Sequence, residues 1–304
     1  MGNIVKITEI LDPDELSLVT SKHNGLAALP ILTDWSIIIS VFVLMSIYTN
    51  PFSILLGTFI LGGRMLGLGV VVHEAGHRTL FSSKALNNIA GNWLAGYWIF
   101  SHKDNYMQEH LEHHRQAGTE KDPDLNNYKN YPIDRKSFKR KITRDLTGQV
   151  GWRRIKSIAR ATRRFSSLNN NMKQYLLRCY ALNLIMLLTM GLFGEAWLYL
   201  TWVVAFMTSH MFVTRIRQIA EHAAVPDLFD VDPRRNTRTL YISWLERLLI
   251  APHGVNYHME HHLLASAPIY RLSAMHRMLL KKGYYCDVDF QRGYLSLLRQ
   301  VVGN

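Results

Sequence analysis

Three short motifs bring histidines to spacings that suit metal ligands. They contain His73 and His77; His110, His113 and His114; and His258, His261 and His262. On an α-helix, positions i, i+3 and i+4 lie within an arc of about 100°, so each motif can direct its imidazoles to one side. Buried imidazoles need a partner for their lone pairs, and a metal ion provides one. Eight neutral nitrogen ligands exceed what one four-coordinate zinc ion needs, and imidazole also suits iron. The motifs therefore predict a two-metal centre.

The first motif also fits a different chemistry. His73-Glu74-Ala-Gly-His77 has the His-Glu-x-x-His pattern of zinc hydrolases, in which the Glu is the general base. An intramembrane zinc metalloprotease is therefore a distant alternative, although it leaves the other six clustered histidines unexplained. In a two-metal centre, Glu74 would instead orient a ligand imidazole.

Four apolar runs must position these motifs. They cover residues 31–48, 52–72, 179–193 and 196–214. Each is about the length that roughly 30 Å of hydrocarbon requires at about 1.5 Å per residue. Paired as two hairpins, they return both ends of the chain to one side of a bilayer. We therefore predict an all-α membrane protein with four transmembrane helices in two hairpins and a cytoplasmic helical cap that holds a di-metal site.

The charge of the chain is unevenly distributed. The net charge of +12 could suggest a nucleic-acid partner, but fourteen of the 35 Lys and Arg residues lie within 135–178, directly before an apolar run. The positive-inside rule expects this of a cytoplasmic loop, so we predict no nucleic-acid partner. Interleaved apolar residues favour an amphipathic helix on anionic lipid headgroups, with a solvated loop as the alternative.

Three smaller features refine this picture. Residues 88–100 are apolar but too short to span a membrane, which predicts an interfacial or re-entrant piece. Arg64 lies inside the second run, where an ionisable residue is either functional or snorkels to the interface. The two cysteines are too few for a disulfide framework, and the first thirty residues lack the apolar core of a signal peptide.

Taken together, these motifs resemble the membrane fatty acid desaturase superfamily of non-haem di-iron enzymes. The resemblance runs from about residue 64 to about residue 277. It rests on His-Glu-Ala-Gly-His, on His-Leu-Glu-His-His followed by Asp-Pro-Asp-Leu, on Gln-Ile-Ala-Glu-His, and on Asn-Tyr-His-Met-Glu-His-His. It implies a desaturase-like domain at 31–277, between a cytoplasmic N-terminal segment at 1–30 and a cytoplasmic C-terminal segment at 278–304.

The resemblance also implies a ligand set. The eight clustered histidines would bind two iron ions, and zinc can replace iron in purified protein. Relatives add a histidine from an extension of the fourth spanning helix and a carboxamide that reaches a metal through water, which correspond to His222 and Gln218. Glu221 could instead orient a ligand imidazole. The five other histidines are expected to be structural, and they are His23, His102, His210, His253 and His276.

The function implied is an O2-dependent fatty acid desaturase that acts on an acyl-lipid, acyl-CoA or acyl-carrier substrate. A hydroxylase or a carotenoid ketolase on the same scaffold is the main alternative, and a non-catalytic metal- or lipid-binding membrane protein is another. The chain has no haem-domain, Rossmann or iron–sulfur motif. A separate ferredoxin, rubredoxin or haem-protein electron donor is therefore expected. The predicted location is a bacterial inner membrane, with the termini and the metal site cytoplasmic.

Overall fold

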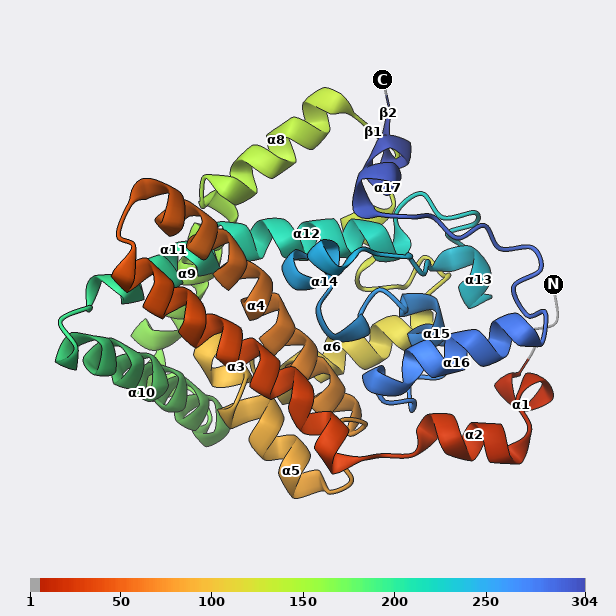
Figure 1. The fold of residues 1–304 in the computed structure, drawn as a ribbon, viewed down its shortest axis with the longest axis horizontal. Helices are drawn as coiled ribbons and strands as arrows, with labels where there is room; N and C mark the ends of the chain where they lie inside the picture. The colour runs from red at the N-terminus through yellow and green to blue at the C-terminus, as the bar shows by residue number, and fades with distance from the viewer. Residues whose placement is uncertain (1–5, 304) are drawn as a thin grey trace.

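The computed structural model describes residues 6–303, which are mostly helical (Figure 1). The first residues of the predicted N-terminal segment, 1–5, lie outside the described part. In chain order, the α-helices are α1 (Ile7–Ile10), α2 (Pro13–Thr20), α3 (Asn24–Ile47), α4 (Pro51–His77), α5 (Lys84–Asn88), α6 (Lys103–Gln116), α7 (Leu125–Tyr128), α8 (Arg135–Leu146), α9 (Gln149–Arg163), α10 (Asn170–Leu192), α11 (Trp197–Met207), α12 (Ser209–His222), α13 (Pro233–Asn236), α14 (Trp244–Leu249), α15 (His258–Leu263), α16 (Ile269–Lys281) and α17 (Tyr294–Val301).

Short turns and one small strand pair complete the chain. The π and 3₁₀ turns are η1 (Ile89–Trp93), η2 (Gly96–Ile99), η3 (Phe165–Ser167) and η4 (Pro252–Gly254). Strands β1 (Ile133–Asp134) and β2 (Val302–Gly303) pair in parallel, with Ile133 opposite Val302. This pair ties the end of the described chain to the start of α8.

Four helical stretches within residues 6–303 are long and apolar enough to cross a membrane. They are Pro13–Ile47, Pro51–His77, Asn170–Leu192 and Trp197–His222. Each stretch overlaps one predicted span and extends beyond it at one end or both. The helices begin where a side chain caps them, before the apolar run starts: His23 accepts from the N–H of Leu26 at α3, and Asn169 accepts from that of Met172 at α10.

Helix α4 is the central element and packs against α3, α11, α12 and α6. Two of its glycines allow neighbouring chains to approach closely. A Cβ at Gly62 would lie 2.2 Å from Ser209 Oγ, and one at Gly63 would lie 2.5 Å from the Leu249 carbonyl oxygen. Small residues of this kind favour tight helix contacts in membranes. Their position fixes α4 against α12 and α14, and so places the last turns of α4.

The fourth predicted span is interrupted. Its backbone leaves the helical region at Thr208 (φ −119°, ψ −85°), which divides it into α11 and α12. Helix α12 then continues to His222, as the sequence predicts for the extension of this run. Helix α9 packs against the break, where a Cβ on Gly151 would lie 2.3 Å from Met207 Cα.

The two segments expected at a membrane surface are both helical. Residues 84–100 form α5, η1 and η2, none of which is long enough to span a bilayer. The basic segment forms two amphipathic helices, α8 and α9, separated by Gly148 at φ 76°. The prediction of an amphipathic helix holds for the local structure, while its contact with lipid stays a prediction.

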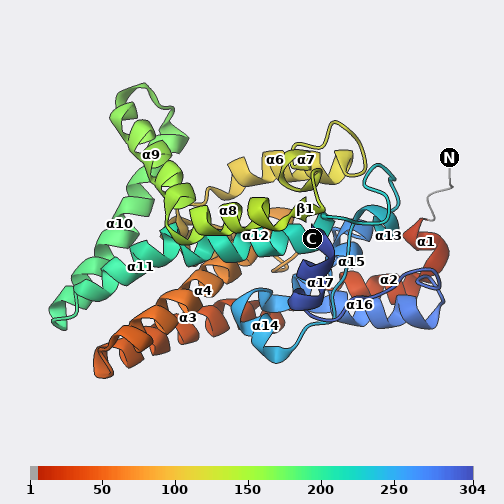
Figure 2. The same ribbon diagram turned by 90° about the horizontal axis from the view of Figure 1, so that it is seen from above.

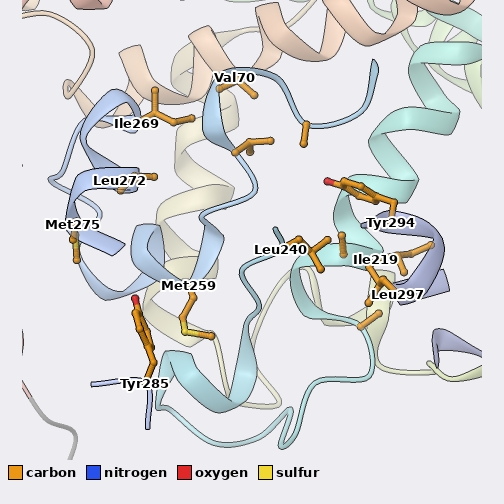
Figure 3. Packing of buried hydrophobic residues seen from close by; sticks show 14 of the residues in the cluster. Val70, Ile219, Leu240, Met259, Ile269, Leu272, Met275, Tyr285, Tyr294 and Leu297 are labelled. Atoms are coloured by element: carbon orange, nitrogen blue, oxygen red, sulfur yellow. The ribbon is translucent and has the colours of Figure 1, made fainter. Parts of the chain in front are cut away.

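The apolar helices and the short helices lie at opposite ends of the molecule. Figures 1 and 2 show α3, α4, α10 and α11 at one end and α1, α2, α13, α15 and α16 at the other. A hydrophobic core fills the second end, and the residues labelled in Figure 3 come from α4, α12, α15, α16, α17 and the intervening loops. Helices α4 and α12 contribute to this core, so each runs from the apolar end into the end that carries the histidine motifs.

Arg64 of α4 forms a buried ion pair and does not reach an interface. Its Nη1 lies 3.0 Å from Asp34 Oδ1 in α3, and the two residues are 2% and 0% exposed. The second carboxylate oxygen of Asp34 lies 2.8 Å from His253 Nε2 in η4. The Arg64 guanidinium also donates to the Leu248 carbonyl. This network connects the apolar helices to the loop that precedes α15.

Candidate metal centre

Four helices present histidines to one region of the structure. Helix α4 provides two from its last turns, α6 provides three, α12 provides one from its C-terminal end, and α15 provides three. The motifs of α6 and α15 each fit on about two helical turns, so their imidazoles project on one side. The nine histidines that the sequence singles out are therefore brought together from positions up to 189 residues apart, His73 to His262 (262 − 73).

These nine residues form two groups in which the ligand atoms lie within 4.8 Å of one another, and each group could hold a metal ion. The first group contains His73, His77, His110, His114 and His261. The second group contains His113, His222, His258 and His262. Each group combines residues from at least three helices. The neighbours His113 and His114 belong to different groups, as do His261 and His262.

The spacing within the first group suits ligands around a shared cation. The Nε2 atom of His110 lies 2.8 Å from that of His73, 3.0 Å from that of His77 and 3.0 Å from that of His114. The His114 Nε2 atom lies 2.9 Å from that of His261. Two ligands at right angles, each about 2.1 Å from a metal, would be roughly 3.0 Å apart. The observed separations match this value.

The proton position on His222 suits a metal ligand. The Nδ1 atom of His222 lies 3.0 Å from the backbone carbonyl oxygen of Asn236, which can only accept, so Nδ1 carries the proton. The Nε2 atom of a neutral His222 is then an unprotonated lone pair, as metal binding requires. It lies 2.9 Å from the Nε2 atom of His258, whose Nδ1 lies 3.4 Å from the Glu221 carboxylate. The donor set of the two groups therefore fits a pair of metal ions.

Burial favours the neutral form of four imidazoles of α6 and α15. Desolvation, followed by the charge of the surrounding histidines, holds the pKa of His110, His258 and His261 well below the ordinary value. Desolvation likewise lowers the pKa of His114 to about 3. Neutral imidazole is the form that binds metals, so the protein prepares these side chains for that role.

Carboxylates hold several of the imidazoles by their other ring nitrogen. Glu74 Oε1 lies 3.0 Å from His73 Nδ1, and its second oxygen accepts from Thr79 Oγ1 at 2.9 Å and from the N–H of Ile269 at 3.0 Å. Asp122 Oδ1 lies 2.8 Å from His113 Nδ1. Such contacts fix the ring orientation and the tautomer of a metal ligand. The expected role for Glu74 agrees with this geometry.

Glu221 and Gln218 lie beside the second group. The Glu221 carboxylate forms an ion pair with Arg217 at 2.6 Å in addition to its contact with His258. Gln218 lines a cavity of about 190 Å³ that His110, His113, His222 and His258 also line. Its place in this cavity is compatible with a contact through water, and its predicted role stays a prediction.

The five histidines expected to be structural lie outside both groups. His23 and His102 cap α3 and α6, and His253 pairs with Asp34. His276 Nδ1 lies 2.6 Å from Glu260 Oε1. His210 is buried on α12, and its Nδ1 atom has no hydrogen-bond partner within residues 6–303.

Sequence reasoning missed three residues near the groups. Asp122 belongs to the Asp-Pro-Asp-Leu motif that follows the second histidine cluster, so the motif held the signal for it. The Asn236 carbonyl and Arg217 gave no signal, because a backbone acceptor has no sequence signature and the Arg217 position depends on how α12 packs.

Comparisons with known proteins agree with this geometry. The profile of the family described as "Fatty acid desaturase" matches residues 49–289. A dihydrorhizobitoxine desaturase of Bradyrhizobium elkanii is 25% identical over 296 aligned residues, which cover 90% of this chain and 80% of the relative. Two β-carotene ketolases from strains of Paracoccus sp. are each 26% identical over 214 residues, which cover 68% of this chain and 72% of theirs.

Proposed function

The chain belongs to the fatty acid desaturase family, and on that premise we propose that it is a membrane di-iron desaturase that introduces a double bond into a fatty acyl chain. The observation that carries this proposal is the convergence of nine histidines into two groups that could each hold a metal ion. The family match and the four apolar helices support an oxidoreductase in a lipid bilayer.

In this proposal, His73, His77, His110, His114 and His261 hold one iron, and His113, His222, His258 and His262 hold the other. When bound, an iron pair can use O2, two external electrons and two protons to remove two hydrogens from neighbouring methylenes, which gives an alkene and two waters. Iron, and not zinc, is proposed because zinc has no redox chemistry.

The role of the protein's own residues is to hold the ligands and keep the centre dry. Glu74, Asp122 and the Asn236 carbonyl accept the Nδ1 protons of His73, His113 and His222, so their Nε2 lone pairs face the metal positions. The ligand histidines are largely buried, which limits access of bulk water to the reacting carbon.

We further propose the arrangement in the membrane. Helices α3 and α4 form one hairpin and α10 to α12 the other, the metal groups lie in a cytoplasmic cap, and the domain spans residues 31–277. The basic helices α8 and α9 support a cytoplasmic placement in a bacterial inner membrane. A reporter enzyme that is active only in the cytoplasm, fused after residue 148, tests the orientation. It should be active if this loop is cytoplasmic and inactive if the loop lies on the other side of the membrane.

The electron donor is proposed to be a separate acidic protein such as a ferredoxin or rubredoxin. Lys136, Lys139 and Arg140 of α8 are exposed and could attract it. Reversal of these charges should raise the KM for the donor and leave the metal content unchanged. A donor KM that stays at the wild-type value would exclude this surface as the docking site.

A carotenoid ketolase is the second candidate, because two of the relatives are β-carotene ketolases. Lipid profiling of cells that express the chain distinguishes the two activities. New double bonds in acyl chains would support the desaturase. An unchanged acyl profile with an oxygenated carotenoid would support the ketolase and overturn our proposal.

The substitution Glu74→Gln separates the proposal from a zinc protease. A protease would lose its general base and nearly all its rate. In a desaturase, Gln can still accept from His73 Nδ1, so the chain should keep its metals and a measurable rate. Proteolytic activity in the wild-type chain that disappears in E74Q would exclude the desaturase.

A further inference from the structure

A cavity with several polar side chains lies beside the first histidine group. We call it the Arg154 cavity; it has a volume of about 160 Å³, and Arg154, His210, Thr214 and Arg217 line it together with His73 and with apolar residues such as Leu66 and Val70. It thus places His73 of the first group next to polar side chains of α9 and α12.

Several polar atoms around this cavity lack protein partners. His210 is 5% exposed, and its Nδ1 atom has no hydrogen-bond partner within residues 6–303. The hydroxyl oxygen of Thr214 is also buried without a partner in the described chain. Arg154, which is half-buried, donates from Nη2 to the carbonyls of Ile99 at 3.3 Å and Phe100 at 3.5 Å. Buried polar groups are costly when unpaired, so the His210 and Thr214 atoms indicate a polar ligand.

The two cavities beside the histidine groups differ in the charges that line them. No Asp or Glu lines the Arg154 cavity, and its Arg217 is balanced by Glu221 at 2.6 Å, so Arg154 remains as an uncompensated positive charge. The 190 Å³ cavity beside the second group is lined instead by Glu109, Asp124 and Glu221. An anionic group is therefore attracted to the Arg154 side and repelled from the other.

A separate apolar cavity lies near Arg154 and His210. It has a volume of about 720 Å³, and Trp98 of η2, Trp202 and Phe206 of α11 are among the residues that line it. The Phe206 ring lies 4.9 Å from the Arg154 guanidinium and stacks on His210 at 5.9 Å. Phe206 therefore lines the apolar cavity and contacts two residues that line the Arg154 cavity. This arrangement fits a molecule with a hydrocarbon body and a charged end.

We infer that the Arg154 cavity binds the carboxylate of an amphiphilic substrate, with Arg154 as the charge partner and His210 and Thr214 as hydrogen-bonding groups. This inference rests on the proposed function and narrows its substrate class. Because His73 lines the same cavity, the carboxylate would bind close to the first histidine group, and oxidation should occur nearer to the carboxyl end than to the middle of a long chain. A substrate with a free acid is then preferred over its ester.

Binding without turnover tests this assignment. The full-length, iron-loaded protein in lipid nanodiscs, under nitrogen and without an electron donor, is titrated with octanoate and with methyl octanoate by calorimetry. The wild type should bind octanoate at least about tenfold more tightly than methyl octanoate, because a charge-assisted hydrogen bond contributes about that much. We call this the octanoate-to-ester affinity ratio. Arg154→Gln should reduce this ratio to near one, and Arg154→Lys should retain part of it.

Arg153→Gln is the matched control, because Arg153 is the exposed neighbour on the same helix and should leave the ratio unchanged. If R154Q does not fold, Thr214→Val removes one unpartnered hydroxyl and should weaken octanoate binding severalfold. A wild-type ratio near one, an unchanged ratio in R154Q, or an equal loss in R153Q overturns the inference. A preserved octanoate preference in a chain that yields no alkene would overturn the proposed function alone.

Discussion

Each imidazole of the two histidine groups has two nitrogens, and in several of them one nitrogen is held by a neighbouring acceptor. In His113 and His222, Nδ1 is occupied by the Asp122 carboxylate and by the Asn236 carbonyl. The free ring nitrogen can then face a metal with its lone pair. The identity of the partner matters, because a carboxylate raises the basicity of the imidazole more than a carbonyl does. His113 and His222 therefore differ in the group that orients the ring, which is a charged carboxylate for His113 and a neutral carbonyl for His222.

We predict that His222→Ala removes one of the two metals. Its group has four histidines, and three remaining ligands on a partly open site would hold iron weakly. The metal content measured by mass spectrometry should fall from about two to about one per chain, and desaturation should stop. The control is His23→Asn, which keeps the cap of α3 and should keep both metals. Two metals in H222A would show that His222 is not a ligand.

Asp122→Asn tests whether the carboxylate beside His113 strengthens metal binding in the second group. The amide can still accept from His113 Nδ1 but carries no charge, so metal affinity in the second group should fall about 10- to 100-fold. Competition with a chromophoric chelator measures this change. Asp104→Asn, an exposed carboxylate on α6, is the matched control. Equal affinities in D122N and the wild type would mean that the carboxylate does not act on the metal.

At the scale of elements, α4 carries both the central packing and the first motif. It contacts α3, α11, α12 and α6, and its last turns lead directly into His73 and His77. The ion pair between Arg64 and Asp34 fixes its rotation relative to α3. The contact between Asp34 and His253 extends this constraint to η4, which precedes α15. A shift of α4 would therefore move ligands on two helices together.

Asp34→Asn should destabilise the protein strongly. It leaves the Arg64 charge buried and without its partner, and breaking such a pair costs about 3–5 kcal/mol. The thermal midpoint in detergent should fall, and the double variant D34N with Arg64→Met should recover part of the loss. The exposed pair of Arg115 and Glu112 provides the control, since Arg115→Gln should cost less than about 1 kcal/mol. Similar midpoints for D34N and R115Q would contradict this account.

At the scale of the whole molecule, the two histidine groups bring α15 together with helices of the apolar end: α4 packs against α6 and α12, whereas α15 packs mainly against α13 and α16. Their ligands come from α4, α6, α12 and α15. Figure 1 shows α4 and α12 reaching from the apolar end towards α15 and the other short helices. Bound metals would therefore act as cross-links between the apolar helices and the short helices at the other end.

Metal removal should consequently loosen the fold. Because metal binds the folded site and not a preformed site in the unfolded chain, its loss removes binding free energy from stability. Dialysis against a strong chelator should lower the thermal midpoint and expose α6 and α15 to proteolysis, and added Fe²⁺ should restore both. The H222A variant should show a smaller shift, since it begins with fewer metals. An unchanged midpoint after verified metal loss would show that the fold does not depend on the metals.

The sequence by itself determined which residues could do the chemistry. The spacing of three histidine motifs, the four apolar runs and the resemblance to desaturases identified all nine histidines that the structure gathers, together with Glu74. These features are local or compositional, so helix geometry and hydropathy are enough to recognise them. The bounds of the helices were less well determined, because caps such as His23 and Asn169 lie outside the apolar runs.

Only the tertiary structure decided how the histidines divide. Successive residues on a helix point about 100° apart, which allows His113 and His114 to serve one group or two, and the packing of α12 and α15 around α6 places them in different groups. Tertiary packing also brings the Asn236 carbonyl to His222 and places Arg154 in the same cavity as His73. A backbone acceptor has no sequence signature, and the position of Arg154 depends on how α9 packs, so no local pattern predicts either.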